Sequence, residues 1–292
     1  MCSSDLDTRL GLPWSSSQSG SNTSFTMTRA VYAGAVDALA KLKELAAMTL
    51  GGAAEDYDVA DEKVFSKKDA AKSMTFAAAA QKAIEVGGKF SGKELPADIH
   101  AITKTAAMGI AGTGLVGVAK DNIAMTGTVP AIAVAFVEIE LDRETGQVDI
   151  VDYLGVADCG KVLHPQGLDA QIKGGAVMGF GMARSERHIY DPQNGFPGNT
   201  AMYQAKLPSY LDVPSTMHGM AVDLEDPQNP VGAKGIGEPV EGCANAAVLC
   251  AISDALGGHW FNRAPIMADM IVNAAANRPQ SDRKSTRLNS SH

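Results

Sequence analysis

Two clusters of glycine constrain the fold of this chain more than any other feature of its sequence. Four glycines lie within residues 174–181, and three lie within residues 232–237. Each glycine in a helix interior costs about 1 kcal/mol relative to alanine, so we expect such clusters only where the backbone closely approaches another backbone or a flat ligand. Close helix–helix packing and ligand binding are therefore the two interpretations of the first cluster.

The remaining composition is that of a globular protein. Hydrophobic residues make up 45% of the chain and charged residues 20%, which predicts a buried core rather than disorder. The net charge of −8 argues against nucleic-acid binding, because the chain has no excess of basic side chains to neutralise phosphates. The most apolar stretch, residues 123–139, is interrupted by polar residues and falls short of the roughly 20 apolar residues of a membrane span. Because no signal peptide is recognisable, a cytoplasmic location is the default expectation.

The four cysteines, Cys2, Cys159, Cys243 and Cys250, form no CxxC pair. This pattern is typical of free thiols in a reducing compartment and lacks the spacing of iron–sulfur ligands. We therefore assign no metal-ligating residues to the chain.

The two ends differ in character from the rest of the sequence. KSTRLNSSH at the C-terminus resembles a translated sequencing-adapter read-through, and MCSSDL at the start resembles its opposite-strand counterpart. We expect residues 1–6 and 281–292 to be non-native and the chain to be part of a longer protein. The remainder is expected to form two subdomains, residues 7–130 and 131–280.

Hydrophobic periodicity predicts helices and strands in irregular alternation. Apolar residues three or four apart indicate a helix from residue 31 to the glycines at 51 and 52, with Lys41 off its apolar face. Further helices are expected over residues 75–86, 165–183 and 239–256, and short strands over 57–65. The pattern over residues 93–117 is ambiguous, and its glycines suggest a loop.

A hairpin gives the clearest β-strand signal. Apolar residues alternate with polar ones over residues 133–141, and after a turn at 143–146 we expect the same alternation to continue through Val148, Ile150, Leu154 and Val156. The predicted fold class is α+β, with mixed sheets and an antiparallel hairpin flanked by helices.

Glu238 follows the second glycine cluster in the motif GAKGIGEP. The spacing fits neither a Rossmann fingerprint nor a P-loop. It predicts a tight loop that delivers one carboxylate to the N-terminus of a helix opened by Pro239. Glu238 is then either an ordinary acid in the first helical turn or a general base.

Three other segments carry candidate groups. Gln171 precedes the first glycine cluster and offers a donor and an acceptor to the edge of a heterocycle. The run 20–24 before the first helix is either a helix N-cap or an anion-binding nest. Cys159 and His164 are interpreted as a buried thiol and a solvent-facing histidine, with a nucleophilic thiol–imidazole pair as the alternative.

Taken together and in this order, the motifs resemble the molybdopterin-binding large subunit of the xanthine dehydrogenase family. This family of molybdenum hydroxylases also includes aldehyde oxidoreductases and aerobic carbon monoxide dehydrogenase. The resemblance covers residues 131–273 and, more thinly, 12–130, and corresponds to the C-terminal part of such a subunit. It rests on FVEIELDRETGQVDI, ADCGKVLHP, Gln171 with GGAVMGFG, YQAKLPSYLDVP and GAKGIGEP.

The resemblance implies roles for individual residues. Glu238 of the KGxGEP motif corresponds to the catalytic base, and Gln171 of the QxxGG motif corresponds to a residue that contacts the pterin cofactor. The other cofactor-binding positions that it implies are Gly237 and the small and hydroxyl residues Gly20, Ser21, Thr23 and Ser24.

The implied activity is hydroxylation of an aldehyde or N-heterocycle with oxygen derived from water, with Glu238 as general base. The implied cofactor is molybdopterin, with its cytosine dinucleotide form as one candidate, and iron–sulfur clusters and FAD are expected on other domains or subunits. The N-terminal half of the same subunit and a small-molecule substrate are the further expected partners. The alternatives are a non-catalytic binding or assembly module of the same fold and a thiol hydrolase that uses Cys159 and His164.

We expect the isolated 292-residue chain to be poorly soluble and to hold no molybdenum by itself, because the rest of the subunit would cover an apolar face and enclose the cofactor. Metal analysis of the purified chain tests this expectation. Recovery of one molybdenum per chain would contradict it.

Overall fold

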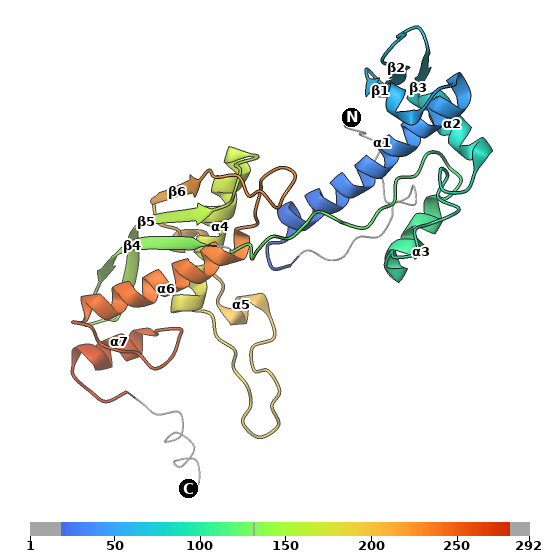
Figure 1. The fold of residues 1–292 in the computed structure, drawn as a ribbon. Coiled ribbons are helices and arrows are strands. Elements are labelled where there is room, and N and C mark those ends of the chain that lie inside the picture. The colour runs from blue at the N-terminus through green and yellow to red at the C-terminus, as the bar shows by residue number, and fades with distance from the viewer. Residues whose placement is uncertain (1–18, 131, 281–292) are drawn as a thin grey trace. The chain divides into compact units, whose positions relative to one another are not determined.

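The computed structural model describes residues 19–130 and 132–280, and the chain divides into two compact units (Figure 1). Unit 1 comprises the residues up to Gly127 together with Gln228–Pro230, and unit 2 comprises Thr128–Pro227 and the residues from Val231 onward. The ends expected to be non-native, 1–6 and 281–292, lie outside the described residues.

Unit 1 is built on one long helix, α1 (Thr28–Leu50), which a π-helical turn, η2 (Thr23–Met27), precedes. The helix ends where Gly51 adopts a φ of 83°, a backbone conformation that glycine favours. The predicted helix and the predicted short strands are therefore confirmed here. The other elements of unit 1 are η3 (Ala54–Asp56), the antiparallel strands β1 (Tyr57–Ala60), β2 (Lys63–Ser66) and β3 (Ser73–Thr75), and the helices α2 (Phe76–Val86) and α3 (Ala101–Ile110).

Helix α3 corrects the expectation of a loop over residues 93–117. His100 caps the helix, since its Nδ1 accepts a hydrogen bond from the N–H of Ile102 at 3.2 Å. Ala107 is buried on the inner side of the helix in a cluster with Ile99 and Val116. A histidine cap and an apolar contact across the following loop are weak local signals, which is why periodicity missed this helix.

Lys41 was expected off the apolar face of α1, but its side chain is only 7% exposed. Its Nζ lies 2.6 Å from the Asp37 carboxylate and donates to the carbonyl of Val116 at 2.9 Å. The segment around Gly117 packs directly on α1, since a β-carbon added to Gly117 would lie 2.8 Å from that of Ala38. This long-range packing buries Lys41, and the ion pair with Asp37 and the hydrogen bond to Val116 offset the cost of burying its polar group.

Buried polar side chains hold the segment Gln228–Pro230 in unit 1. The Arg29 guanidinium, 5% exposed as a residue, pairs with Asp121 at 2.6 Å and donates to the carbonyl of Gln228. The Gln228 side chain accepts the N–H of Thr126 at 2.9 Å, and the Asn229 amide donates to the carbonyl of Phe25 at 2.9 Å. These bonds satisfy groups that would be costly to bury alone.

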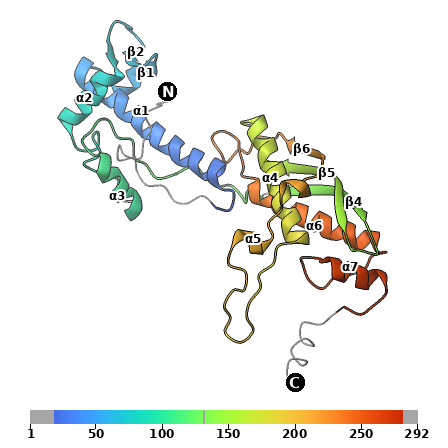
Figure 2. The ribbon, with the colours of Figure 1, turned by 180° about the vertical axis from the view of Figure 1, so that it is seen from behind.

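Unit 2 has a mixed three-stranded sheet covered on one face by helices α4 and α6 (Figure 1 and Figure 2). Strands β4 and β5 form the predicted antiparallel hairpin, and β6 adds to β5 in parallel. The fold class is therefore α+β, as predicted. The bounds are β4 (Ala133–Leu141), β5 (Val148–Asp158), α4 (Pro165–Arg184), α5 (Met202–Ala205), η4 (Tyr210–Asp212), β6 (Thr216–Val222), α6 (Gly237–Ala255) and α7 (Ala268–Ala275).

The expected alternation in β5 is wrong beyond Ile150. The pairing register shifts between Glu138 and Ile139, which leaves Val151 as an extra residue on β5. A bulge of this kind moves the following side chains to the opposite face. Tyr153, Gly155 and Ala157 therefore face the core, and Leu154 and Val156 face away from it.

The first glycine cluster brings the backbones of α4 and α6 together. A β-carbon added to Gly179 would lie 2.5 Å from the carbonyl oxygen of Glu241, and one added to Gly175 would lie 2.9 Å from that of Gly237. Gly174, in contrast, is exposed and has no atom within 4 Å of such a β-carbon. Helix packing, one of the two interpretations of the cluster, thus accounts for Gly175 and Gly179.

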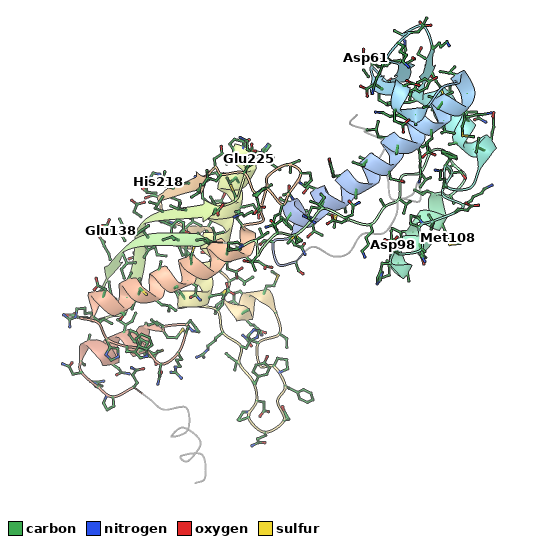
Figure 3. All side chains as sticks on the ribbon, viewed as in Figure 1. Asp61, Asp98, Met108, Glu138, His218 and Glu225 are labelled. Carbon is green, nitrogen blue, oxygen red and sulfur yellow. The ribbon has the colours of Figure 1, made fainter. Side chains whose placement is uncertain are left out.

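The face of the sheet opposite these helices carries exposed apolar side chains. In one row Val134 pairs with Val156 and Val156 with Met220, and in the next Phe136 pairs with Leu154. Phe136 is 61% exposed and Met220 57%. His218 continues the second row beyond Leu154, and Glu138 lies further along β4 on the same face (Figure 3).

Within the described ranges, no helix is both long enough and apolar enough to cross a lipid bilayer.

Gly179→Ala should destabilise unit 2 by about 1–3 kcal/mol, because the added methyl group forces α4 away from α6. Gly174→Ala is the matched control in the same helix. It should raise the free energy of unfolding by up to about 1 kcal/mol, since it adds helix propensity and meets no neighbour. Urea unfolding of the two variants measures both effects. Equal effects of the two substitutions would contradict the packing role of Gly179.

Candidate functional site

Glu238 lies in the first turn of α6, and its side chain is exposed. The helix begins at Gly237, and its N-cap residue, Ile236, makes no side-chain cap hydrogen bond in the described structure. Pro239, at the next position, has no N–H to leave unsatisfied and suits the first turn. The sequence motif therefore folds as predicted, into a loop that delivers one carboxylate to the beginning of a helix.

Gln171 lies near the same end of α6. It is exposed on α4, one turn before Gly175, and Gly175 packs against the carbonyl of Gly237. Residues four apart share a face of a helix, so Gln171 projects past the point where α6 starts. The packing of the two helices thus brings three predicted residues, Gln171, Gly237 and Glu238, to one end of unit 2.

The hydroxyl-rich run 20–24 belongs to unit 1. Gly20 and Ser21 have positive φ angles of 64° and 56°, and η2 follows with Asn22 as its N-cap. In the described part of the chain, neither N-cap residue, Asn22 of η2 or Met27 of α1, makes a side-chain cap hydrogen bond. The left-handed φ of Ser21 followed by the right-handed φ of −90° at Asn22 turns successive backbone N–H groups toward a common point, as anion-binding nests do.

A buried ion cluster joins the two loops that precede α4 and α6. Lys234, with a side chain 12% exposed, lies 2.8 Å from the Asp158 carboxylate and 3.9 Å from that of Asp226. The backbone also pairs here, because the N–H of Lys234 donates to the carbonyl of Cys159 at 2.8 Å and the N–H of Lys161 to that of Gly232 at 2.7 Å. The motifs ADCGKVLHP and GAKGIGEP are therefore adjacent in space.

The Lys234 ammonium lowers the pKa of the Asp158 carboxyl below its ordinary value by hydrogen bonding to it. Burial opposes this effect, and the N–H of Gly160, 3.2 Å from Oδ1 of Asp158, adds to it. Sequence reasoning did not identify this cluster. Its only local signal was that each of the two motifs carries a charged residue beside its glycines.

Cys159 and His164 serve separate structural roles. The Cys159 thiol is buried and donates to the carbonyl of Gly160 at 3.5 Å, and burial raises the pKa of this thiol. The His164 Nδ1 accepts the N–H of Gly167 at 2.7 Å and caps α4. Among the described residues no hydrogen bond joins Cys159 to His164, so the structure gives the thiol hydrolase alternative no support.

Comparison with known families and proteins gives consistent matches. A family model for the molybdopterin cofactor-binding domain matches residues 4–214, which include the run 20–24 and Gln171 but end before Glu238. The chain is 34% identical over 157 residues to the 6-hydroxypseudooxynicotine dehydrogenase complex subunit gamma of Paenarthrobacter nicotinovorans, a match that covers 53% of this chain and 20% of that protein. It is 32% identical over 139 residues to the putative xanthine dehydrogenase molybdenum-binding subunit of Escherichia coli K12, with 48% of this chain and 18% of that protein covered.

Among solved structures, quinoline 2-oxidoreductase from Pseudomonas putida 86 is similar, with a TM-score of 0.65 and 26% identity. The similarity covers 90% of this chain and 31% of that chain. The chain spans about a fifth of the length of the curated relatives that it matches.

Asp158→Asn should make the free energy of unfolding less sensitive to acid. A carboxyl whose pKa is lowered in the folded state stabilises the fold above its unfolded pKa of about 3.9, and this contribution is lost as the pH falls through the folded pKa. Urea unfolding at several pH values between neutral and about 2.5 measures the difference between the wild type and the variant.

Glu225→Gln is the control, since Glu225 is an exposed acid 3.7 Å from Lys161 in the same region (Figure 3). It should leave the pH dependence of the wild type unchanged. If Asp158→Asn followed the wild-type pH dependence as well, the Asp158–Lys234 pair would contribute nothing to the fold.

Proposed function

This chain belongs to the molybdopterin cofactor-binding domain family of the xanthine dehydrogenase type, and we propose that it forms part of an oxidoreductase that hydroxylates an aldehyde or N-heterocycle. The observation that carries the proposal is the projection of Gln171 and Glu238 at one end of the α4–α6 pair. An exposed amide and an exposed carboxylate on two rigidly packed helices can bind a cofactor and act as a base beside it.

The groups in unit 2 fit the pterin in their chemistry. The amide of Gln171 offers donors and an acceptor to a heterocycle edge, and α6 begins at Gly237, where its N-cap residue makes no side-chain cap hydrogen bond in the described structure. The first N–H groups of a helix, with the positive end of its dipole, suit an anionic oxygen or phosphate. Gln171 and Gly237 would therefore hold the pterin in unit 2.

The run 20–24, in unit 1, fits an anionic group by its chemistry. It combines three hydroxyl side chains with the left-handed φ of Ser21 followed by the right-handed φ of Asn22, which suits a phosphate group. When bound, the molybdenum cofactor supplies the oxygen-transfer chemistry and accepts two electrons from the substrate. The residues that would hold its phosphate are Gly20, Ser21, Thr23 and Ser24.

Glu238 would act as the general base. Its exposed carboxylate, in the first turn of α6, would take the proton of the hydroxyl group that attacks the electron-poor carbon of the substrate. The positive end of the helix interacts favourably with the ionised carboxylate, the form that accepts this proton.

The activity is that of a longer protein, since the chain spans about a fifth of its curated relatives. The names of two similar proteins refer to the N-heterocycles xanthine and quinoline, which supports an N-heterocycle as substrate. The electrons would leave through iron–sulfur clusters and FAD on other domains or subunits, and one relative is named as a subunit of a dehydrogenase complex.

Glu238→Gln in the complete enzyme should lower kcat by ~10²–10⁴-fold, because the amide cannot accept the proton. Molybdenum content should stay at the wild-type level, since the substitution is isosteric and exposed. Steady-state kinetics and metal analysis of the same preparation test the two expectations together.

Glu241→Gln, one turn further along α6, is the matched control and should retain the wild-type kcat. Full turnover in the Glu238→Gln variant would reject the general-base role. It would favour the alternative of a non-catalytic module with the same fold.

A further inference from the structure

We infer that Lys234 is a positioning residue for Glu238, acting through the buried ion cluster with Asp158 and Asp226. The inference rests on the proposed function, since it concerns the carboxylate proposed as the base. Lys234 precedes Glu238 by four residues, in the loop that ends at the beginning of α6.

The cluster holds the first part of this loop against the end of β5. The Lys234 ammonium binds Asp158 at 2.8 Å and has the Asp226 carboxylate at 3.9 Å, with the two acid side chains 23% and 7% exposed. Gly160 and Ala233 form an antiparallel bridge at the same place. A buried lysine with two carboxylates is costly to assemble, and breaking it leaves uncompensated charge, so the loop has one strongly favoured position.

Ile236 holds the second part of the loop. Its side chain is 6% exposed and lies in an apolar cluster with Ala157, Cys159 and Val240. Lys234 and Ile236 thus fix the two ends of a three-residue segment, and α6 starts directly after it. Glu238 follows in the first turn of α6, so the backbone that these anchors hold sets the point from which its side chain extends.

The two anchors differ in how they can be tested. Replacing Ile236 would open a cavity in the core, whereas replacing Lys234 changes charge at nearly constant volume. Lys234→Met keeps the aliphatic stem and removes the ammonium. Lys161→Met is the matched control, because Lys161 is 45% exposed in the adjacent loop and lies 3.7 Å from the exposed Glu225.

The first measurement is amide hydrogen exchange in the 292-residue chain, which requires no cofactor. The Lys234 and Val240 N–H groups are the probes, since they donate to the carbonyls of Cys159 and Ile236. Lys234→Met should raise exchange at residues 234 and 240 by at least about tenfold, with β4 and β5 unchanged, because only the loop loses its anchor. Lys161→Met should leave exchange in both places unchanged. Equal increases throughout unit 2, or none at residues 234 and 240, would overturn the inference.

The second measurement is a double-mutant cycle in the complete enzyme. Lys234→Met should lower kcat by about 10–100-fold at unchanged molybdenum content, since a displacement of about 1 Å in a catalytic group can cost 100-fold. In a Glu238→Gln background the same substitution should have less than about a twofold effect, because the lysine acts through the glutamate. Lys234→Arg should restore most of the activity.

The cycle separates failure of this inference from failure of the proposed function. An equal loss in the two backgrounds would overturn the positioning role while leaving the general base intact. Full activity of Glu238→Gln alone would reject the proposed base, and with it the positioning role. If Lys234→Met does not fold, Asp158→Asn replaces it in the exchange experiment and should likewise raise exchange at residues 234 and 240.

Discussion

Unit 2 depends on the close approach of the α4 and α6 backbones. At Gly175 and Gly179, α4 places no side chain between the two helices, so its backbone packs directly on the backbone of α6 and on the side chains of Val240 and Ala244. The sheet packs against this pair, and the exposed Gln171 and Glu238 each project from one of the two helices. Backbone atoms cannot change rotamer as side chains do. The backbone positions of Gln171 and Glu238 are therefore held more rigidly relative to one another than the exposure of their side chains suggests.

The first glycine cluster illustrates how a sequence signal can have two causes in one helix. Gly175 and Gly179 face α6, and their small size is explained by helix packing. Gly174 lies on the same turn of the helix but has no atom within 4 Å of an added β-carbon, so helix packing does not explain its small size. The number of glycines alone supports helix packing and ligand binding equally. Only the side of the helix on which each glycine lies distinguishes the two interpretations.

Local patterns predicted local structure well. The 3.6-residue period identified α1, proline or glycine signals and composition identified α2, α4 and α6, and the two-residue period identified the hairpin, because these signals depend only on neighbouring residues. The motif around Glu238 likewise folded as a loop followed by a helix. The position of the bulge at Val151 was not predictable, since it depends on the pairing register of two strands.

The buried lysine contacts that sequence reasoning missed involve residues far apart in the chain. Asp158 and Lys234 are 76 residues apart, and Lys41 is buried by a carbonyl 75 residues away. A charged residue in a single sequence is normally read as exposed, and nothing near it reveals a distant partner. Buried pairs such as these must be found in three dimensions.

The membership of Gln228–Pro230 in unit 1 has a consequence for how the chain can be divided. A cut after Gly127 would produce a polypeptide that lacks the carbonyl to which Arg29 donates and the amide that binds Phe25. Unit 1 is therefore not one continuous stretch of sequence, although each unit is compact. A chain recombined at that boundary would keep these bonds only if it also carried residues 228–230. Unit 1 is thus inherited together with the segment that leads to Glu238.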